Sequence, residues 1–401
     1  MAPESTIARP AGSHERFPCF DGVRALAALM VVVYHAVFFN ADFVTKGGSL
    51  FGTLNAGVWI FFVTSGCLLY LPFAASHLTA APGVDVGGYA VRRVARIYPA
   101  YWVVLAFFTF VVPRINIYGL HGFLLHTTLT QTYVHINPFV DGLPPAWSLV
   151  VEVSFYVFLP FYAALIGFLA RRYLALTVEL VGLAVLFVIG IVSIVAIGNG
   201  LDAPWVTVLP QHLGAFALGM LLAVLSARRW EAPAAERLSR IGRPTWAWWG
   251  AGAVALAAIP FVLRLDPLEA PSAAQAIGLN LLQMAVGVCV VVPVVLGPQD
   301  RGAIRRLLRS APAVYLGLIS YGIYLWHWYI LRIVADWLDW PLYRGNWFVV
   351  LLVALPIVVF AASVSWFALE RPVLRLAHRV TPGRDRRADT TARDTHALHD
   401  A

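Results

Sequence analysis

Long apolar runs dominate this chain and predict a bundle of membrane-spanning helices. Ten runs approach or exceed the roughly 20 residues that an α-helix needs to cross a bilayer. Most of the segments between them are short, so the helices should pack together as one compact unit. We therefore predict an all-α polytopic membrane protein, built as a single bundle of about ten transmembrane helices. The ten runs are residues 18–40, 52–75, 97–113, 147–169, 174–197, 205–226, 246–264, 275–297, 312–335 and 346–369.

Polar segments flank the predicted bundle. Residues 1–17 are predicted to form a cytoplasmic tail, residues 18–372 the transmembrane domain, and residues 373–401 a basic cytoplasmic tail. We expect the last segment to be disordered because it is rich in charge and poor in apolar side chains. The first run has full membrane length, which predicts a start-transfer helix rather than a cleaved signal peptide. A weaker apolar stretch at 121–133 predicts an interfacial or re-entrant segment.

Composition supports a membrane protein rather than a soluble enzyme with an anchor. Of the 401 residues, 60% are hydrophobic and only 12% are charged, and the mean hydropathy is +0.75. The net charge of +8 could indicate nucleic-acid binding. The arginines lie mainly in short segments between apolar runs, however, which is typical of membrane topology. Cys19, Cys67 and Cys289 form no CxxC pair and no disulfide framework.

The distribution of basic residues predicts the orientation of the bundle. With the N-terminus in the cytoplasm, most of the 29 lysines and arginines fall in cytoplasmic segments. Short cytoplasmic loops are enriched in such residues, so the asymmetry favours this orientation and places both termini inside. The outer loops hold only Lys46, Arg114, Arg264 and Arg344.

The first apolar run carries three ionisable side chains, Asp21, Arg24 and His35. Arg24 and His35 are eleven residues apart, which is about three helical turns and about 16 Å, so both project from one face. Asp21 precedes Arg24 by three residues and can pair with it. Ionisable groups in a membrane segment usually face the bundle interior or a watery cavity. The structural alternative is an interfacial Asp–Arg anchor with a buried histidine.

An arginine cluster, Arg92, Arg93 and Arg96, precedes the third run on the predicted cytoplasmic side. It is either a topology anchor or a clamp for a cytosolic anion. Arginine binds phosphate in a bidentate manner. Coenzyme A carries a 3′-phosphate and a diphosphate, so the cluster would suit the head group of an acyl-CoA.

Two further runs carry polar stripes. Ser148, Glu152 and Tyr156 share one face at the start of the fourth run, where Glu152 is either an interfacial salt-bridge partner or a functional acid. Ser320, Tyr324 and His327 follow each other at helical spacing in the ninth run, and such a stripe is more plausible along a cavity than against lipid. In the second run, Gly57 and Gly66 predict close helix packing around Ser65.

Taken in order, these motifs resemble acyltransferase family 3, a family of integral membrane proteins associated with O-acylation of extracytoplasmic sugars. The first motif matches the family pattern of a basic residue, ten intervening residues and a histidine, the proposed catalytic residue of the family. The resemblance extends from Phe20 to Pro372. Its motifs lie at Phe20 to His35, Gly57 to Gly66, Arg92 to Trp102, Trp147 to Tyr156, Ser320 to His327 and Glu370-Arg371-Pro372.

The resemblance implies a reaction and a set of site residues. It implies a membrane O-acyltransferase that moves an acyl group, acetyl or another short chain, from cytosolic acyl-CoA to an extracytoplasmic hydroxyl. It implies no bound cofactor, with acyl-CoA as co-substrate, and a carbohydrate or glycosylated acceptor beside the lipid bilayer. The residues that carry over are His35, Arg24 and Glu152 as catalytic; Arg92, Arg93 and Arg96 as donor-binding; and Tyr156, Ser320, Tyr321, Tyr324 and His327 around a substrate cavity.

Several alternatives stay open from the residues alone. A transporter or flippase for a lipid-linked or small glycan could use the same polar stripes, although the two halves of the chain show no evident repeat. An envelope polysaccharide, peptidoglycan or a macrolide-type metabolite could each be the acceptor. The histidines of the outer loop, His121, His126 and His135, have spacings that fit no single helical face, and we expect no metal site.

The predicted topology can be tested with reporter fusions. A reporter fused after Ala401 or within residues 228–243 should report a cytoplasmic location, and one near Asp141 an external location, because of the arginine asymmetry. An external signal from the C-terminal fusion would contradict the topology.

Overall fold

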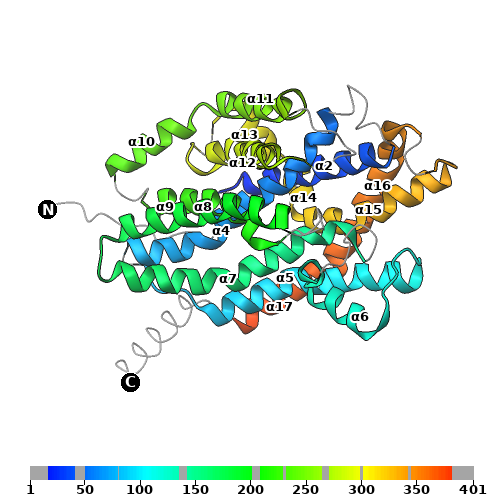
Figure 1. The fold of residues 1–401 in the computed structure, drawn as a ribbon, viewed down its shortest axis with the longest axis horizontal. Coiled ribbons are helices and arrows are strands. Elements are labelled where there is room, and N and C mark those ends of the chain that lie inside the picture. The colour runs from blue at the N-terminus through cyan, green and yellow to red at the C-terminus, as the bar shows by residue number, and fades with distance from the viewer. Residues whose placement is uncertain are drawn as a thin grey trace, which may run out of the picture.

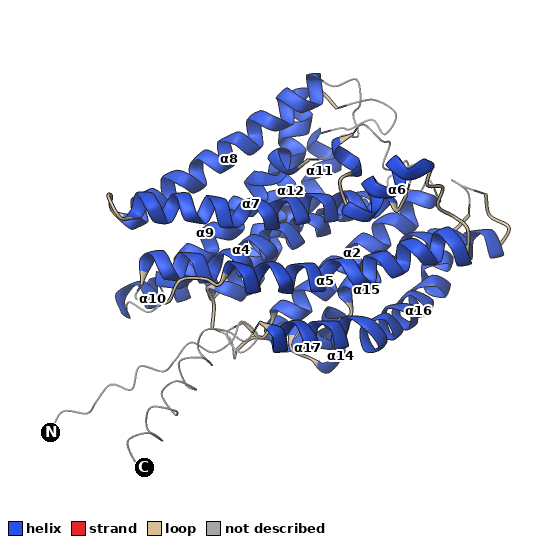
Figure 2. Ribbon diagram, turned by 90° about the horizontal axis from the view of Figure 1, so that it is seen from below, coloured by secondary structure: helices blue, strands red, loops and turns tan. Residues whose placement is uncertain are grey.

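A computed structural model describes most of the chain, and in it every regular element is a helix (Figures 1 and 2). In these residues, nine helical segments are long and apolar enough to cross a membrane, which confirms the all-α polytopic prediction. The described residues are 17–40, 50–79, 81–134, 142–200, 208–228, 232–263, 271–298, 301–341 and 345–381. The nine segments are built on α2 (Phe20–Phe39), α4 (Gly57–Leu78), α5 (Val86–Ala106), α7 (Trp147–Ala170), α8 (Ala175–Gly200), α9 (Leu209–Ala227), α11 (Thr245–Leu263), α12 (Ala273–Val295) and α16 (Trp347–Ser365).

The tenth predicted span, residues 312–335, is divided into two helices. These are α14 (Ala311–Leu318) and α15 (Ser320–Trp337), which meet at Ile319. The polar side chains of α15, among them Ser320, His327 and Arg332, lower its hydropathy, and it is not among the nine segments above. Ser320 and His327 are instead enclosed by protein, as is most of α15, while Arg332 is partly exposed and pairs with Asp336.

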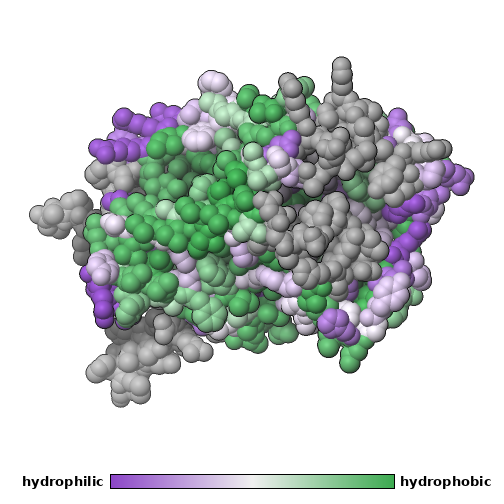
Figure 3. Space-filling view, viewed as in Figure 1, coloured by the Kyte–Doolittle hydropathy of each residue, from purple (hydrophilic) through white to green (hydrophobic). Residues whose placement is uncertain are grey.

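The outer surface of the bundle is apolar around its middle. Figure 3 shows a hydrophobic band across the centre of the molecule, with hydrophilic residues toward the two ends of its long axis. Large apolar side chains such as Phe161, Val254 and Phe360 are at least 70% exposed. Extensive exposed apolar surface is unfavourable in water and marks a surface that contacts lipid or protein. The helices therefore lie along the direction in which they would cross the bilayer.

Helix α2 lies at the centre of the bundle, against α4, α14, α15 and α16, and α4 packs in turn against α9. Glycines allow these close approaches. A Cβ atom at Gly66 would overlap the carbonyl group of Phe216, and one at Gly219 would overlap that of Val63. Gly57 lies equally close to the carbonyl oxygen of Ala27 on α2. Small residues at such positions let membrane helices approach backbone to backbone, as the sequence predicted for Gly57 and Gly66.

Helix α5 begins at Val86, well before the predicted boundary at residue 97. Arg92, Arg93 and Arg96 therefore lie within this helix and not before it, which corrects the prediction. Long arginine side chains extend along a helix and keep their charged groups near polar surroundings. A single π-helical turn, η3 (Phe107–Val111), continues α5 at its other end.

The last predicted run, residues 346–369, is followed by further helix. Helix α16 continues through a π-helical turn, η7 (Trp366–Glu370), into α17 (Arg371–Val380). Pro372 is the second residue of α17. The segment predicted to be disordered from residue 373 is thus helical as far as Val380, and residues 382–401 and 1–16 lie outside the described residues.

Shorter helices cover the ends of the bundle. The stretch predicted to be interfacial or re-entrant forms α6 (Gly119–Thr128) and a 3-10 turn, η4 (Gln131–Tyr133). Tyr101 of α5 donates a hydrogen bond of 2.7 Å to the carbonyl oxygen of His126, which ties α6 to the bundle. His135 and Asp141 of the same loop lie outside the described residues. Two short helices that the sequence analysis missed are α10 (Ala232–Gly242) and α13 (Ala303–Leu308).

The contact between α4 and α9 predicts a large effect of one methyl group. Gly66→Ala or Gly219→Ala should lower the free energy of unfolding by about 1–3 kcal/mol, because the added Cβ atom overlaps backbone that cannot rotate away. Thermal unfolding in detergent measures the change. Gly250→Ala on α11 is the matched control, since a Cβ atom there meets nothing within 4 Å. Equal melting temperatures for all four proteins would contradict the assignment.

Candidate functional site

An internal cavity of about 120 Å³ lies among helices α2, α4, α5, α7 and α15. Apolar side chains of α4, including Phe61 and Phe62, form one part of its wall. Polar groups from all five helices form the rest, so the cavity is suited to a ligand with both charged and apolar parts. Its polar lining residues are Arg24, Thr64, Ser65, Arg93, Arg96, Ser148, Glu152, Tyr156, Ser320, Tyr321 and Tyr324.

Glu152 is fixed in this cavity by two hydroxyl groups. Tyr156, one turn later on α7, donates a hydrogen bond of 2.6 Å to Oε1 of Glu152, and Ser65 of α4 donates one of 3.1 Å to the same oxygen. The i to i+4 spacing on α7 brings the first pair together. Helices α4 and α7 pack against each other, which brings Ser65 within reach. Glu152 is thus oriented across the cavity that Arg24 also lines.

Two of the three predicted donor-binding arginines reach the cavity. The guanidinium carbon of Arg93 lies 5.8 Å from the ring centre of Tyr156, and that of Arg96 lies 5.7 Å from the ring centre of Tyr321. Cation–π contacts of this kind hold a guanidinium group in place without neutralising it. Arg92 is not among the residues that line the cavity. Its Nη1 donates a hydrogen bond of 3.2 Å to Oγ1 of Thr381.

Positive charge exceeds negative charge along the cavity wall. The guanidinium groups of Arg24, Arg93 and Arg96 line it together with a single carboxylate, Glu152. The buried carboxylate of Glu370 lies 3.8 Å from Nη1 of Arg96 and offsets part of this charge. A low-dielectric cavity with excess positive charge favours an anionic ligand.

His35 forms a hydrogen-bonded pair with His327 of α15. Their Nδ1 and Nε2 atoms, respectively, are 2.9 Å apart, and Nδ1 of His327 lies 2.7 Å from the carbonyl oxygen of Tyr324. Trp328 packs against His35 with the ring centres 4.8 Å apart. His327 is fully buried. The sequence analysis placed both histidines in the site but did not predict that they bond to each other.

The histidine pair lies beside the cavity rather than on its wall. Neither His35 nor His327 is among the residues that line the described cavity. Tyr324, one turn before His327 on α15, lines the cavity. Its hydroxyl group lies 2.6 Å from Oγ of Ser148 and donates to the carbonyl oxygen of Pro145 at 2.9 Å. The ring of Tyr324 also contacts that of His327, with the ring centres 5.7 Å apart, so this residue adjoins both the cavity and the histidine pair.

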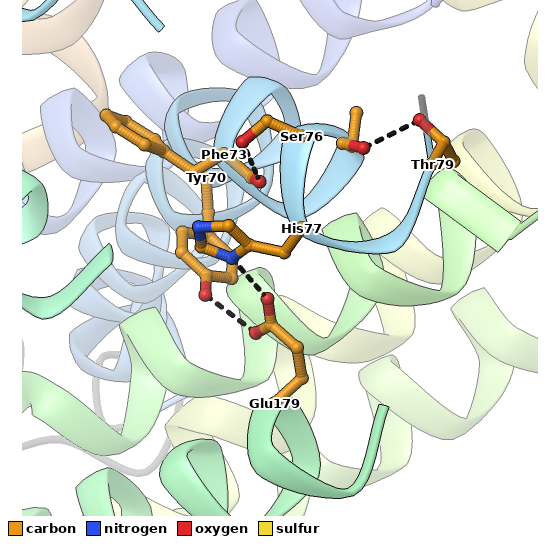
Figure 4. A network of polar contacts seen from close by, with 7 residues as sticks. Tyr70, Phe73, Ser76, His77, Thr79 and Glu179 are labelled. Carbon is orange, nitrogen blue, oxygen red and sulfur yellow. Dashed lines mark hydrogen bonds and ion pairs between the residues drawn. The ribbon is translucent and has the colours of Figure 1, made fainter. Parts of the chain in front are cut away.

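A second polar cluster, which the sequence analysis missed, joins α4 to α8 (Figure 4). Glu179 is fully buried, and its carboxylate accepts a hydrogen bond of 2.6 Å from Tyr70, while Nδ1 of His77 lies 2.7 Å from its other oxygen. A lone acid in a long apolar run was the available signal, because a buried carboxylate needs partners. These three residues do not line the cavity, and we assign them to helix packing.

Comparison with known proteins identifies the family. Residues 17–367 match the acyltransferase domain that defines acyltransferase family 3. The chain belongs to this family. The match covers the five helices that form the cavity, two of which, α2 and α15, carry the histidine pair. In the described residues, no group of three or more His, Cys, Asp and Glu side chains could hold a metal ion.

Several relatives are about one quarter identical to this chain over the aligned residues. The chain is 26% identical over 393 residues to the peptidoglycan O-acetyltransferase OatA of Listeria monocytogenes, covering 90% of this chain and 56% of that protein. It is 25% identical over 406 residues to the acyltransferase MdmB of Streptomyces mycarofaciens, covering 92% of this chain and 94% of that protein. The chain thus spans little more than half of the first relative and nearly all of the second. No solved structure matches the chain.

Proposed function

We propose that this protein transfers an acetyl group from cytosolic acetyl-CoA to a hydroxyl group of an extracytoplasmic carbohydrate. The single observation that carries the proposal is the arginine-lined cavity that ends, at Tyr324, beside the pair His35–His327. The cavity suits a phosphate-bearing donor, and an imidazole suits proton transfer at a hydroxyl group. Relatives named as peptidoglycan O-acetyltransferases support both the acetyl group and a carbohydrate acceptor.

The donor is proposed to bind through its phosphates. Arg93 lies about seven residues, or roughly 11 Å, from the start of α5, and Arg96 one turn further. With the N-terminus in the cytoplasm, these two guanidinium groups occupy the inner half of a hydrocarbon core about 30 Å thick. Acyl-CoA cannot cross lipid, so a site open to the cytoplasm has to hold it while its thioester extends toward the outer half.

We propose that the acceptor hydroxyl approaches His35 from the extracytoplasmic side. His35 lies 15 residues after Phe20 and hence about 23 Å along α2. Arg24, on the same helix face, lies about 16 Å closer to the inner side. Under this proposal, charge recognition and proton transfer lie at different depths of one bundle. A donor on one side and an acceptor on the other can then meet without either crossing the membrane.

The hydrogen bonds of His327 determine the proton positions on His35. A carbonyl oxygen only accepts, so Nδ1 of His327 carries a proton and donates to Tyr324. The partners that the structure gives His327 are carbonyl oxygens and an imidazole, none of which carries negative charge, so a neutral ring is favoured. Nε2 of His327 then accepts from Nδ1 of His35. The lone pair of His35 is left on Nε2, where it can act as a base.

The chemical step follows from that tautomer. Nε2 of His35 takes the proton of the acceptor hydroxyl as the oxygen attacks the thioester carbonyl carbon. The carbon–sulfur bond then breaks, the leaving thiolate takes the proton from His35, and the products are an ester and free coenzyme A. His327 accepts a hydrogen bond throughout and holds the ring in the basic tautomer, so it acts as a positioning residue.

The histidine pair gives a direct test of this mechanism. His35→Ala should lower the transfer rate by about 10²–10⁴ with little change in the KM for acetyl-CoA, because general acid–base catalysis contributes that much. His327→Phe should lower kcat by roughly 10²-fold at unchanged donor KM, since the wrong tautomer of His35 then becomes available. His327→Gln keeps an acceptor oxygen and should recover part of the rate. Near-wild-type transfer by His35→Ala would overturn the mechanism.

The arginines provide an independent test of the donor site. Arg93→Ala or Arg96→Ala should weaken acetyl-CoA binding by about 1.5–3 kcal/mol, roughly 10- to 150-fold, because each removes a hydrogen bond to a charged phosphate. Arg92→Ala is the matched control, since Arg92 bonds Thr381 and does not line the cavity. Binding is measured by calorimetry on purified protein in nanodiscs. Equal affinities for all three variants and the wild type would leave these arginines as topology anchors.

A further inference from the structure

Arg96 has a carboxylate beside it that does not belong to the cavity wall. Nη1 of Arg96 lies 3.8 Å from Oε2 of Glu370, and Glu370 is only 2% exposed. Arg96 lines the arginine-lined cavity, whereas Glu370 is not among the lining residues. Arg96 thus adjoins both the cavity and a buried carboxylate outside its wall.

A π-helical turn brings Glu370 to this position. Glu370 is the last residue of η7 and directly precedes α17, and both of these segments pack against α5 (Figure 1). Single π-helical turns within longer helices are frequent at functional sites. Two polar contacts join the segments to α5, the one from Glu370 to Arg96 and a hydrogen bond of 3.2 Å from Arg92 to Thr381. Helix packing, and not only the ion pair, thus places Glu370 next to Arg96.

The pair between Glu370 and Arg96 acts through charge rather than through a hydrogen bond. A separation of 3.8 Å is beyond hydrogen-bond distance. In the part of the chain that the structure describes, Oε2 of Glu370 and Nη2 of Arg96 have no hydrogen-bond partner, and Oε1 of Glu370 accepts a bond of 3.3 Å from Ser365. The carboxylate oxygens of Glu179, by contrast, lie 2.6 and 2.7 Å from their partners. Glu370 therefore offsets the charge of Arg96 without fixing its orientation.

Tyr321 supports the guanidinium group of Arg96 instead. The guanidinium carbon lies 5.7 Å from the ring centre of Tyr321, and the hydroxyl group of Tyr321 donates a hydrogen bond of 2.7 Å to the carbonyl oxygen of Ile97. The ring is thus tied to α5 one residue after Arg96. Removing the charge of Glu370 should therefore leave Arg96 at the cavity and increase the positive charge that a ligand meets there.

We propose that Glu370 is a positioning residue of the donor site that acts through Arg96. It is the counter-ion of Arg96 while the cavity is empty, and its charge limits how tightly the phosphates of coenzyme A bind. A buried arginine without a counter-charge is costly in a membrane protein, so the carboxylate stabilises the unliganded bundle. The same charge opposes an anionic ligand and favours release of coenzyme A after transfer. This inference rests on the proposed function, in which Arg96 binds the donor.

Calorimetric titration of coenzyme A into the purified full chain in nanodiscs tests the role of Glu370. Glu370→Gln should lower the Kd by about tenfold, because loss of a negative charge beside the guanidinium group strengthens its attraction for an anion. Glutamine has nearly the same shape and can still accept the hydrogen bond from Ser365. Glu370→Asp keeps the charge on a shorter side chain and should lower the Kd by only about two- to threefold. Glu236→Gln is the control, since it removes an exposed carboxylate of α10 that pairs with Arg240, and it should leave the Kd unchanged.

A double-mutant cycle with Arg96→Ala measures whether Glu370 acts through Arg96. In the Arg96→Ala background, Glu370→Gln should change the Kd by less than about twofold, because a buried carboxylate without its counter-ion takes up a proton and loses its charge. A purely structural role of Glu370 would not tighten binding in the wild-type background. Equal tightening in both backgrounds would contradict an action through Arg96.

The outcomes for this inference and for the proposed function are distinct. Unchanged or weaker binding by Glu370→Gln, while Arg96→Ala still weakens binding, would overturn the role of Glu370 and leave the donor site intact. Unchanged binding by Arg96→Ala would overturn the donor site and this inference with it. Melting temperatures in detergent without coenzyme A check that each variant is folded. If Glu370→Gln melts below the titration temperature, wild-type affinity in Glu370→Asp is sufficient to reject the role.

Discussion

The need to satisfy polar groups away from water governs this structure. An ionisable side chain inside a bilayer costs several kcal/mol unless the protein encloses it and provides partners. Helix α2 carries Arg24 and His35 through the apolar layer, and the surrounding helices supply what they require. The imidazole of His327 reaches His35 from α15, and the hydroxyl groups of Ser65 and Tyr156 hold Glu152 opposite Arg24.

The sequence predicted the membrane spans well, because apolar runs of the right length have few alternatives in a bilayer. The predicted helix boundaries were wrong where a helix continues through polar residues. Helix α5 starts at Val86, because arginines are accommodated in a helix near its end, and α17 extends past Pro372. Within the site, helical spacing identified the stripes of α2, α7 and α15. It could not assign partners across helices, so the pair His35–His327, the turning away of Arg92 and the cluster at Glu179 emerged only in three dimensions.

The arginine-lined cavity and the cluster at Glu179 differ in how far neighbouring groups satisfy their charges and hydrogen bonds. The cluster at Glu179 is closed, with both carboxylate oxygens in hydrogen bonds, and it holds α4 against α8. The arginine-lined cavity keeps excess charge, which a packed interior would otherwise eliminate. Excess charge is costly inside a membrane protein, so the cavity marks a place that favours a ligand of opposite charge.

The backbone contacts of α2 also constrain how the molecule can move. Gly57 lies against Ala27, Gly22 against Leu308, and Gly317 against Asp21, with no side chain between the helices to deform. Sliding α2 past its neighbours would drive carbonyl groups into one another. Movement within the site is therefore left to side-chain rotation rather than to displacement of α2. Such rotamer changes are far faster than the rocking of two half-bundles in alternating access.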